Sequence, residues 1–321
     1  MNKYVIGLDI GGTKCAVALG EIIGDEIKVI HKVCFRTEVL KGVEYTMQKI
    51  YEAIDAVLDK GLPVSAIGIS CGGPLDSRKG IIMSPPNLPG WNHIPIKELF
   101  EKRYNIPTGI QNDANACALA EWQYGAGRGY SNVIFLTFGT GMGAGLILNG
   151  QLYTGTNDMA GEVGHIRLCE LGPVGYGKAG SFEGFCSGGG IAQFARTKVL
   201  EQIQNGLDVS FCKTLNELDT VDAKTVAEAA QQGDALAIDI YKDCGTYLGK
   251  ALSILIDVLN PEVIILGSIY NRVQSLLEPT MRLEIEKESL RYSRSVCRVV
   301  PSGLGDSIGD VAALSVASNL L

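Results

Sequence analysis

Residues 8–19, LDIGGTKCAVAL, carry the main signal for the fold of this chain. An apolar run ends in Asp9, a Gly-Gly-Thr turn follows, and a second apolar run begins at Cys15. This order predicts a β-hairpin with a glycine-rich turn, and residues 27–35 are expected to form a third strand. Residues 136–148, LTFGTGMGAGLIL, repeat the order of strand, Gly/Thr turn and strand. The weak repeat predicts two related domains rather than a solenoid.

Helical and strand-like patterns alternate outside these two hairpins. Residues 43–58 place their apolar side chains on one helical face, and Gly61 is expected to end that helix. The alternation predicts an α/β protein with mixed sheets and helices packed on them. The other expected helices are 96–104, 188–203, 223–232 and 234–259. Three more are expected: one after Asn112-Asp113 that runs to about 124, one between the last two strands, and one from about 310. The other expected strands are 66–70, 107–111, 261–266 and 296–300.

Length and composition exclude several classes of protein. A chain of 321 residues exceeds what one compact core usually holds, so two domains are expected. The net charge is −7 and no Lys/Arg run is long enough to form a tail, which argues against a nucleic-acid-binding face. The nine cysteines form no C-x-x-C pair, as is typical of free thiols in a reducing compartment. With no signal peptide or long apolar span in the sequence, we expect a cytoplasmic protein that binds neither nucleic acid nor membranes.

The first glycine-rich turn is a candidate phosphate-binding loop. Gly11 and Gly12 allow backbone N–H groups to approach phosphate oxygens, and Thr13 adds a hydroxyl donor, with Lys14 directly after it. Asp9 at the strand end is a candidate to hold Mg²⁺ through water. The same residues are also compatible with an ordinary hairpin turn.

The second glycine-rich turn, residues 139–145, contains Thr140 and Gly141. It resembles a dinucleotide-binding fingerprint, but that fingerprint requires a helix immediately afterwards. Residues 146–150 form a strand and turn pattern instead, which argues against such a site. Two Gly/Thr hairpins, one in each half of the chain, are better suited to hold one phosphate chain from two sides.

Two further segments carry candidate catalytic or binding groups. Asp113 stands at a strand-to-helix junction, where it is either a helix N-cap or a general base. Glu162 and His165 lie among glycines in GEVGH, residues 161–165, which is unusual for a core histidine. A structural histidine that pairs with the backbone remains an alternative for His165.

These motifs, taken in order, resemble the ROK family of bacterial sugar kinases and repressors, and the resemblance covers essentially the whole chain. The ROK family belongs to the actin/hexokinase-like ATPase fold. Each motif is weak alone, and their common order makes the resemblance strong. The matching segments are LDIGGTK at 8–14, NLPGW at 87–91, NDANACALAE at 112–121, FGTGMGAG at 138–145, GEVGH at 161–165, NPEVIILGS at 260–268 and GDSIGDVAA at 305–313.

The resemblance implies a fold, a reaction and partners. The fold would be a two-domain α/β actin-like (ribonuclease H-like) ATPase fold with a central cleft, with one domain of residues 1–118 completed by helix 306–321, and another of residues 119–305. The reaction would transfer the γ-phosphate of ATP, with Mg²⁺, to a hydroxyl of a small sugar bound between the domains. The 6-hydroxyl of a hexose is the usual target, glucose is the default, and N-acetylmannosamine or another hexose stays open. A homodimer is also expected.

The resemblance also implies roles for individual residues. Asp113 would match the catalytic base. The groups that hydrogen-bond the sugar would be Asn87, Asn112, Glu162, His165 and Glu183. The residues that line the ATP phosphates would be Gly11, Gly12, Thr13, Thr140 and Gly141, with Gly267 near the adenosine.

A zinc site found in many ROK members is altered in this sequence. That site combines a histidine, matched by His165, with three cysteines in the pattern C-x-C-G-x-x-G-C-x-E. Val174, Tyr176 and Ser181 stand at the three cysteine positions, so no structural zinc is expected. The nearby thiols, Cys169 and Cys186, have the wrong spacing. The apolar anchors expected to hold the loop of residues 166–186 instead are Tyr176, Phe182 and Phe185.

A sugar-sensing ROK protein without catalytic activity is the alternative function. ROK repressors carry an additional N-terminal helix-turn-helix segment, whereas the first strand here is expected to begin at about residue 4. The presence of Asp113 also favours the kinase.

Overall fold

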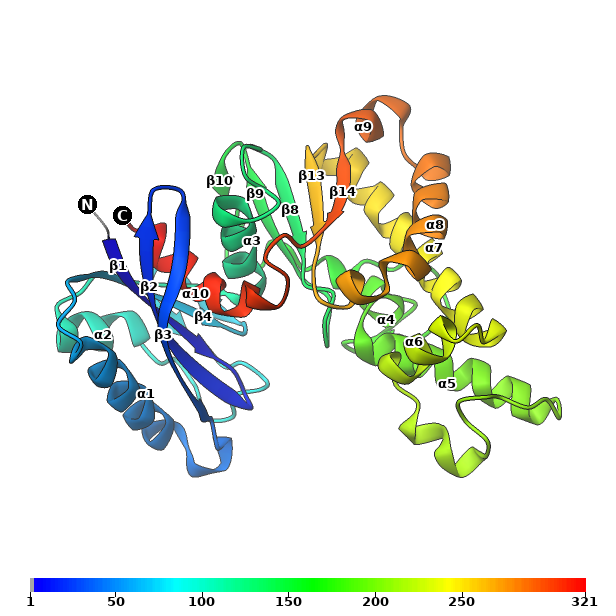
Figure 1. The fold of residues 1–321 in the computed structure, drawn as a ribbon, viewed down its shortest axis with the longest axis horizontal. Coiled ribbons are helices and arrows are strands. Elements are labelled where there is room, and N and C mark those ends of the chain that lie inside the picture. The colour runs from blue at the N-terminus through cyan, green and yellow to red at the C-terminus, as the bar shows by residue number, and fades with distance from the viewer. Residues whose placement is uncertain (1–2) are drawn as a thin grey trace. The chain divides into compact units, whose positions relative to one another are not determined.

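The chain forms two units by its internal packing, and the computed structural model describes residues 3–321 (Figure 1). Unit 1 contains the residues up to Phe135 together with Gly145–Gly161 and Gly303–Leu321, and unit 2 contains Leu136–Ala144 and Glu162–Ser302. The expected domain boundary at residues 118 and 119 falls inside helix α3 (Asp113–Tyr124), and all of α3 belongs to unit 1.

The expected N-terminal hairpin is confirmed and forms the centre of the unit 1 sheet. Strands β1 (Lys3–Ile10) and β2 (Lys14–Ile23) pair antiparallel, and β3 (Glu26–Arg36) pairs with β2 at the sheet edge. Strands β4 (Val64–Cys71) and β7 (Thr108–Asn112) continue the sheet in parallel on the other side of β1, which gives the order β3-β2-β1-β4-β7. The carboxyl ends of β1, β4 and β7 therefore lie side by side.

Helices cover both faces of this sheet. Alternate residues of β1 such as Ile6 and Leu8 pack with α1 (Val43–Leu58) and α2 (Ile96–Tyr104) in one apolar core. Val5 packs on the opposite face with α10 (Ile308–Ser318). This alternation follows from the period of two along a strand.

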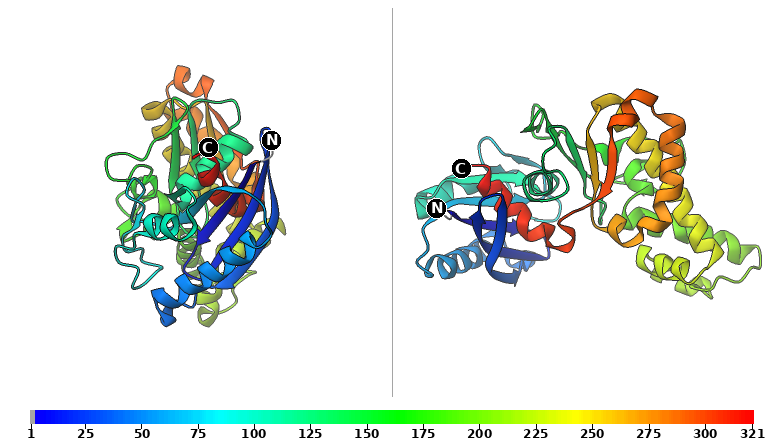
Figure 2. Two further views of the ribbon diagram at one scale, coloured as in Figure 1. Left: turned by 90° about the vertical axis from the view of Figure 1, so that its left-hand side faces the viewer. Right: turned by 45° about the horizontal axis from the view of Figure 1, so that its top comes forward.

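Two glycines let the C-terminal helix α10 approach the sheet closely. Gly7 of β1 and Gly68 of β4 are direct neighbours in the sheet. A Cβ atom on Gly7 would lie 2.7 Å from the Leu314 backbone nitrogen, and one on Gly68 would lie 2.2 Å from the Ala313 carbonyl oxygen. Side chains at these two positions would push α10 off the sheet, so the glycines fix the N-terminal strands beside the end of the chain (Figure 2).

A second five-stranded sheet has the order β10-β9-β8-β13-β14. Its strands are β8 (Val133–Leu136), β9 (Ala144–Leu148), β10 (Gln151–Leu152), β13 (Val263–Leu266) and β14 (Arg298–Pro301). The helices of unit 2 are α4 (Phe182–Phe185), α5 (Gly188–Gln204), α6 (Ala223–Gln231), α7 (Ala235–Leu259), α8 (Ile269–Glu288) and α9 (Arg291–Val296). Short 3₁₀ turns are η1 (Val39–Lys41), η2 (Val163–His165), η3 (Leu215–Thr220) and η4 (Gly305–Ser307).

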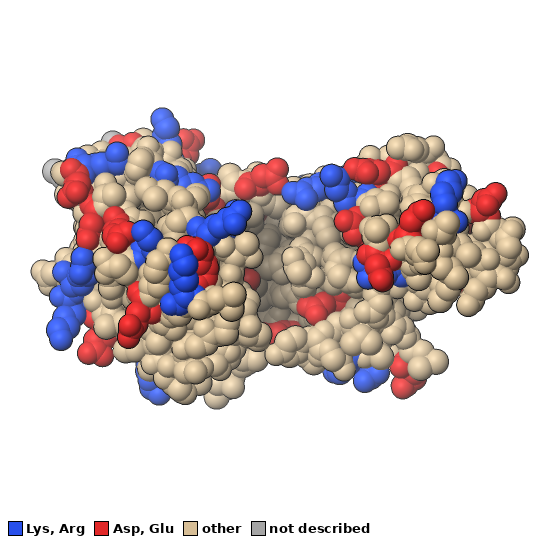
Figure 3. Space-filling view, turned by 90° about the horizontal axis from the view of Figure 1, so that it is seen from below, with Lys and Arg blue, Asp and Glu red and all other residues tan. Residues whose placement is uncertain are grey.

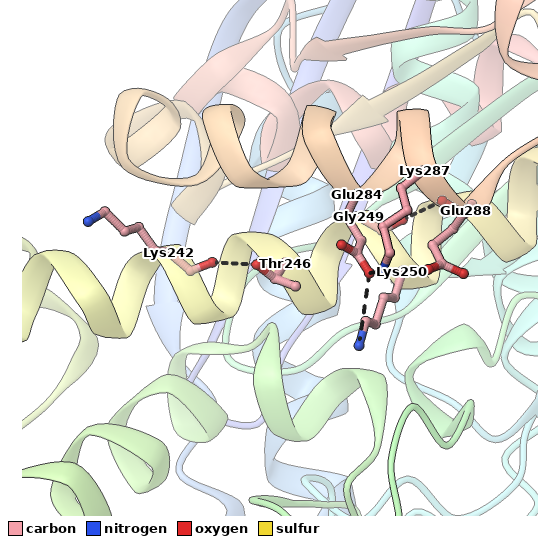
Figure 4. Close-up of polar contacts among 8 residues, drawn as sticks. Lys242, Thr246, Gly249, Lys250, Glu284, Lys287 and Glu288 are labelled. Carbon is pink, nitrogen blue, oxygen red and sulfur yellow. Dashed lines mark hydrogen bonds and ion pairs between the residues drawn. The ribbon is translucent and has the colours of Figure 1, made fainter.

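Helices α7 and α8 pack closely in unit 2 (Figure 4). A Cβ atom on Gly249 of α7 would lie 2.6 Å from the Met281 carbonyl oxygen of α8. The largely buried Glu284 of α8 forms ion pairs with Lys250 of α7 at 3.9 Å and with Lys287 at 3.2 Å. The glycine brings the two backbones together, and the ion pairs lie beside that contact.

The sequence pattern predicted the long elements well and missed the short ones. Helix α2 has the predicted bounds, and the other long helices begin or end within a few residues of the expected positions. The two-residue strands β5 (Leu75–Asp76) and β6 (Ile81–Ile82), and likewise β11 (Val174–Gly175) and β12 (Lys178–Ala179), were not predicted. Elements of this length carry too little periodicity for detection.

Acidic and basic side chains are interspersed over the face seen in Figure 3. The chain as a whole has a net charge of −7. Within residues 3–321, none of the helices combines the length and the apolar character needed to span a membrane.

Candidate active site

The first glycine-rich turn is a tight loop that leaves two backbone N–H groups available. The Gly11 N–H donates to the Lys14 carbonyl oxygen at 3.1 Å and closes the turn, and the Thr37 hydroxyl donates to the Gly11 carbonyl at 2.5 Å. No hydrogen bond among the described residues uses the N–H groups of Gly12 and Thr13. Those two amides, rather than that of Gly11, are therefore left as donors for a ligand.

Asn87 packs against this loop. A Cβ atom on Gly12 would lie 2.4 Å from the Asn87 carbonyl oxygen, and one on Gly72 would lie 3.3 Å from Asn87 Oδ1. Two buried side chains, Leu88 and Trp91, anchor the segment that carries the exposed Asn87. The structure thus brings the predicted phosphate loop and the predicted sugar loop together.

Asn112, not Asp113, caps helix α3. Asn112 Oδ1 accepts a hydrogen bond from the Asn115 N–H at 2.7 Å, which satisfies an amide in the first turn. The reading of Asp113 as the N-cap is therefore wrong. Asp113 Oδ1 accepts the adjacent Ala114 N–H at 2.9 Å, and the residue remains exposed.

Asp9 and Asp113 lie at the carboxyl ends of the parallel strands, and the negative charge of Asp113 raises the pKa of Asp9. The pKa of Asp9 is raised to about 6, mainly by burial and then by the negative charge of Asp113, while Lys14 opposes the shift. The protein packed around the Asp113 carboxylate also raises the pKa of Asp113 by desolvation, against two backbone N–H groups that lower it. Both shifts make these carboxylates more basic than ordinary aspartates.

The second glycine-rich turn, in unit 2, is followed by strand β9 as predicted. Its backbone is held by several hydrogen bonds. The Gly139 N–H donates to the Gly141 carbonyl oxygen at 3.1 Å, and the Gly188 N–H at the start of α5 donates to the Gly139 carbonyl at 2.8 Å. Thr140 is exposed at the tip of this turn.

His165 and Glu183 lie near this second turn, on segments that touch it. A Cβ atom on Gly164 would lie 2.2 Å from the Met142 carbonyl oxygen and 3.3 Å from Glu183 Cβ. Glu183 Oε2 accepts the Met142 N–H at 3.0 Å, a contact that the sequence did not predict. The exposed His165 ring meets the Tyr176 ring edge-on at 5.5 Å between centroids.

The two remaining predicted site residues of unit 2 have different surroundings. Glu162 is exposed directly before the 3₁₀ turn that ends at His165. Gly267 forms the turn between β13 and α8, where its N–H donates to the Leu136 carbonyl oxygen at 3.0 Å and its carbonyl accepts the Tyr270 N–H at 3.2 Å.

The residues at the altered cysteine positions have other roles. Ser181 is buried, and its hydroxyl oxygen caps α4 by accepting the Gly184 N–H at 3.1 Å. Tyr176 is 75% exposed, so its prediction as an apolar anchor is wrong, whereas Phe182 and Phe185 are buried as expected. Tyr176 occupies a left-handed turn position at φ 42°, which directs it away from the core.

The two nearby thiols are also engaged. Cys186 is buried and its thiol donates to the Cys244 carbonyl oxygen at 3.6 Å, while the Cys169 thiol donates to the Leu171 carbonyl oxygen at 2.6 Å. Over residues 3–321, no group of three or more His, Cys, Asp or Glu side chains is arranged to hold a metal ion.

Sequence reasoning missed the ion pair of Lys32 and Asp310, which lies in unit 1. The negative charge of Asp310 raises the pKa of Asp9, and the positive charge of Lys32 lowers it. Asp310 belongs to the GDSIGDVAA segment, but a partner 278 residues away in β3 leaves no local signal.

Comparison with known proteins identifies the family. The ROK family model matches residues 5–319. The glucokinase of Thermotoga maritima is 32% identical over 97% of this chain and 96% of its own length. A ROK family glucokinase from Streptomyces griseus, solved in complex with glucose and AMPPNP, has a TM-score of 0.76 at 29% identity and covers 98% of this chain and 99% of its own.

Regulators are related as well. A solved ROK family transcriptional regulator, a homologue of the E. coli MLC protein, has a TM-score of 0.82 at 26% identity, covering 99% of this chain and 78% of its own. The α/β fold with mixed sheets is the actin-like ATPase fold shared with the ROK glucokinases. The matches extend over nearly the whole sequence, and the chain is a member of the ROK family.

Proposed function

We propose that this protein is an ATP-dependent sugar kinase that transfers the γ-phosphate of ATP to a hexose hydroxyl. One observation carries the proposal. Asn112 caps helix α3, so the Asp113 carboxylate is not used as the cap and stays accessible. Its pKa is raised, and it lies near Asp9 at the ends of the parallel strands. A base with a raised pKa in such a place is suited to accept a proton from an alcohol.

In the proposed reaction, Asp113 accepts the proton of the sugar hydroxyl as that oxygen forms a bond to the γ-phosphorus. The bond between the γ-phosphorus and the bridging oxygen breaks, and ADP leaves. Phosphoryl transfer depends mainly on positioning and charge stabilisation. Among the described residues the N–H groups of Gly12, Thr13, Thr140 and Gly141 make no hydrogen bond, and they are the proposed donors to the phosphates.

Mg²⁺ fits the donor set of unit 1. Asp9 offers a hard carboxylate oxygen of the kind that Mg²⁺ prefers, and its raised pKa reflects burial and the neighbouring negative charge of Asp113. A Mg²⁺ ion bound with ATP would neutralise charge on the phosphates. Lys14 lies next to this carboxylate as a second source of positive charge.

The proposed sugar ligands are Asn87, Asn112, Glu162, His165 and Glu183. Asn87 and the amide nitrogen of Asn112 are available in unit 1, because the capping bond occupies only Asn112 Oδ1. Unit 2 would supply Glu162, His165 and the second carboxylate oxygen of Glu183. We propose the 6-hydroxyl of a hexose as the acceptor, with glucose as the first candidate since the related glucokinases are named for it.

A coupled assay of ADP release over a panel of sugars tests this function. We expect at least one hexose, glucose first and N-acetylmannosamine among the others, to raise ADP release well above the sugar-free rate. If no sugar raises the rate while calorimetry still shows sugar binding, the protein is a sugar sensor, as its likeness to the ROK regulator also allows.

A further inference from the structure

Glu183 is held rigidly within unit 2. It lies on the short helix α4, whose first turn is capped by the buried Ser181 hydroxyl. Its neighbours Phe182 and Phe185 are both buried, and Phe185 stacks on Tyr247 of α7 with 3.5 Å between ring centroids and 9° between ring planes. The half-buried Glu183 therefore projects from a fixed support.

The carboxylate of Glu183 is directed at the second glycine-rich loop. Glu183 Oε2 accepts the Met142 N–H at 3.0 Å, and a Cβ atom on Gly141 would lie 2.9 Å from the same oxygen. Within the described part of the chain, the Met142 amide is the one hydrogen-bond partner of this carboxylate. A bond between an ionised acceptor and an N–H is stronger than a neutral one.

This bond completes a pattern in how the loop amides are used. The Gly139 N–H is bound within the turn, the Gly143 N–H donates to Thr137 Oγ1 at 2.9 Å, and the Met142 N–H goes to Glu183. In residues 3–321, the N–H groups of Thr140 and Gly141 take part in no hydrogen bond. The loop is thus tied at both ends, with two adjacent donors left at its tip.

We propose that Glu183 is a positioning residue for nucleotide binding, which fixes the loop so that the Thr140 and Gly141 amides are oriented toward a phosphate before ATP arrives. Glycine-rich backbone has many accessible conformations, so an unrestrained loop would lose more entropy on binding a phosphate. Glu183 lowers that cost by ordering the loop in advance. The inference rests on the proposed kinase function, and it gives Glu183 a role beyond that of a sugar ligand.

Calorimetric titration with AMPPNP and Mg²⁺, in the absence of any sugar, tests this role. We expect Glu183→Ala to weaken AMPPNP binding by about tenfold, from loss of a charge-assisted hydrogen bond, and Glu183→Gln to weaken it by several-fold. The exposed Glu170 in the neighbouring loop provides the matched control, and Glu170→Gln should bind like the wild type. With no sugar present, the loss of a sugar contact cannot contribute.

Hydrogen exchange gives a second readout that does not depend on ligand. A peptide covering residues 138–145 should exchange faster in Glu183→Gln than in the wild type, while peptides from α7 remain unchanged. Equal AMPPNP affinity of the wild type and both Glu183 variants, with equal exchange, would overturn this inference and leave the kinase proposal intact. No AMPPNP binding by the wild-type protein would overturn both.

Discussion

Asp9 and Asp113 are coupled across the ends of the parallel strands of unit 1. Burial is the first cause that raises the pKa of Asp9 to about 6, and the charge of Asp113 is the second. An ionised Asp9 at this buried position lowers the free energy of unfolding, whereas an ionised aspartate on the surface does not. The protein keeps this carboxylate beside the first glycine-rich turn, which is expected of a site prepared for a cation rather than for stability.

The ligand-free protein should therefore become less stable as pH rises through the range in which Asp9 ionises. Well below pH 3.8, Asp9 is protonated in both the folded and the unfolded chain, and well above pH 6 it is ionised in both. The shift from 3.8 to about 6 corresponds to a destabilisation of roughly 3 kcal/mol above pH 6.

Asp9→Asn should remove this destabilisation. We expect the variant to melt at a higher temperature than the wild type at pH 7, and by a much smaller margin at pH 4. The exposed Asp208 supplies the control, since Asp208→Asn should melt at nearly the same temperature as the wild type at both pH values. If the melting temperatures of Asp9→Asn and the wild type differ by the same amount at pH 4 and pH 7, the raised pKa of Asp9 is contradicted.

Asp113→Asn should abolish turnover without loss of stability. The amide keeps the shape of the side chain but cannot accept the hydroxyl proton, so we expect kcat to fall by ~10²-fold or more. Because desolvation opposes ionisation of Asp113, a neutral side chain should not lower the free energy of unfolding. Turnover within a few-fold of the wild type would remove Asp113 from the mechanism.

The contrast between Asp113 and Asn112 shows where sequence reasoning reached its limit. The pattern placed a strand-to-helix junction at these two residues, and the structure has it there. Both side chains are good N-caps, so the sequence could not decide which one caps. The answer depends on a one-residue choice of where β7 ends, and such boundaries are set by tertiary packing.

The other failures have the same origin in long-range contacts. The β1–β2 hairpin was predictable because strand, turn and strand are adjacent in sequence. The bond from Met142 to Glu183 spans 41 residues and starts from a backbone N–H, which has no sequence signature. Tyr176 was misjudged because its aromatic ring suggested burial, whereas its left-handed turn position places it outside the core.

Replacing Asn112 should separate helix capping from sugar binding. Asn112→Ala loses the capping oxygen, so we expect the free energy of unfolding to fall by about 1 kcal/mol. Asn112→Ser keeps a capping oxygen but shortens the side chain, so stability should hold while the KM for the sugar rises. Denaturant unfolding and steady-state kinetics on both variants test this, and a normal sugar KM in Asn112→Ser would exclude Asn112 as a sugar ligand.

The contact between α7 and α8 should be intolerant of a single methyl group. A Cβ atom on Gly249 would lie 2.6 Å from the Met281 carbonyl oxygen and 2.7 Å from Glu284 Cβ, so Gly249→Ala should destabilise by about 1–3 kcal/mol. Gly309 in α10 is the control, because a Cβ atom there meets no atom within 4 Å. Gly309→Ala should instead be neutral or stabilising by up to about 1 kcal/mol. If Gly249→Ala and Gly309→Ala change the melting temperature equally, the close packing of α7 on α8 is contradicted.

The loop of residues 166–186 should need no metal. Zinc in closed structural sites takes four nitrogen or sulfur ligands. Val174 has no ligand atom, and Tyr176 offers a hydroxyl group in place of a thiol. The Ser181 hydroxyl is buried in the cap of α4. We expect hydrogen bonds and the buried phenylalanines of α4 to hold the loop.

We therefore expect purified protein to contain no stoichiometric zinc, and a strong chelator to leave the melting temperature unchanged. Activity must be measured after Mg²⁺ is restored, because the chelator removes that ion as well. Ser181→Ala provides the positive control for the loop, since loss of the cap should lower stability by about 1 kcal/mol. Elemental analysis that finds about one zinc per chain would refute this prediction, and it would direct attention to Cys169 together with His165, because the Cys186 thiol is buried away from solvent.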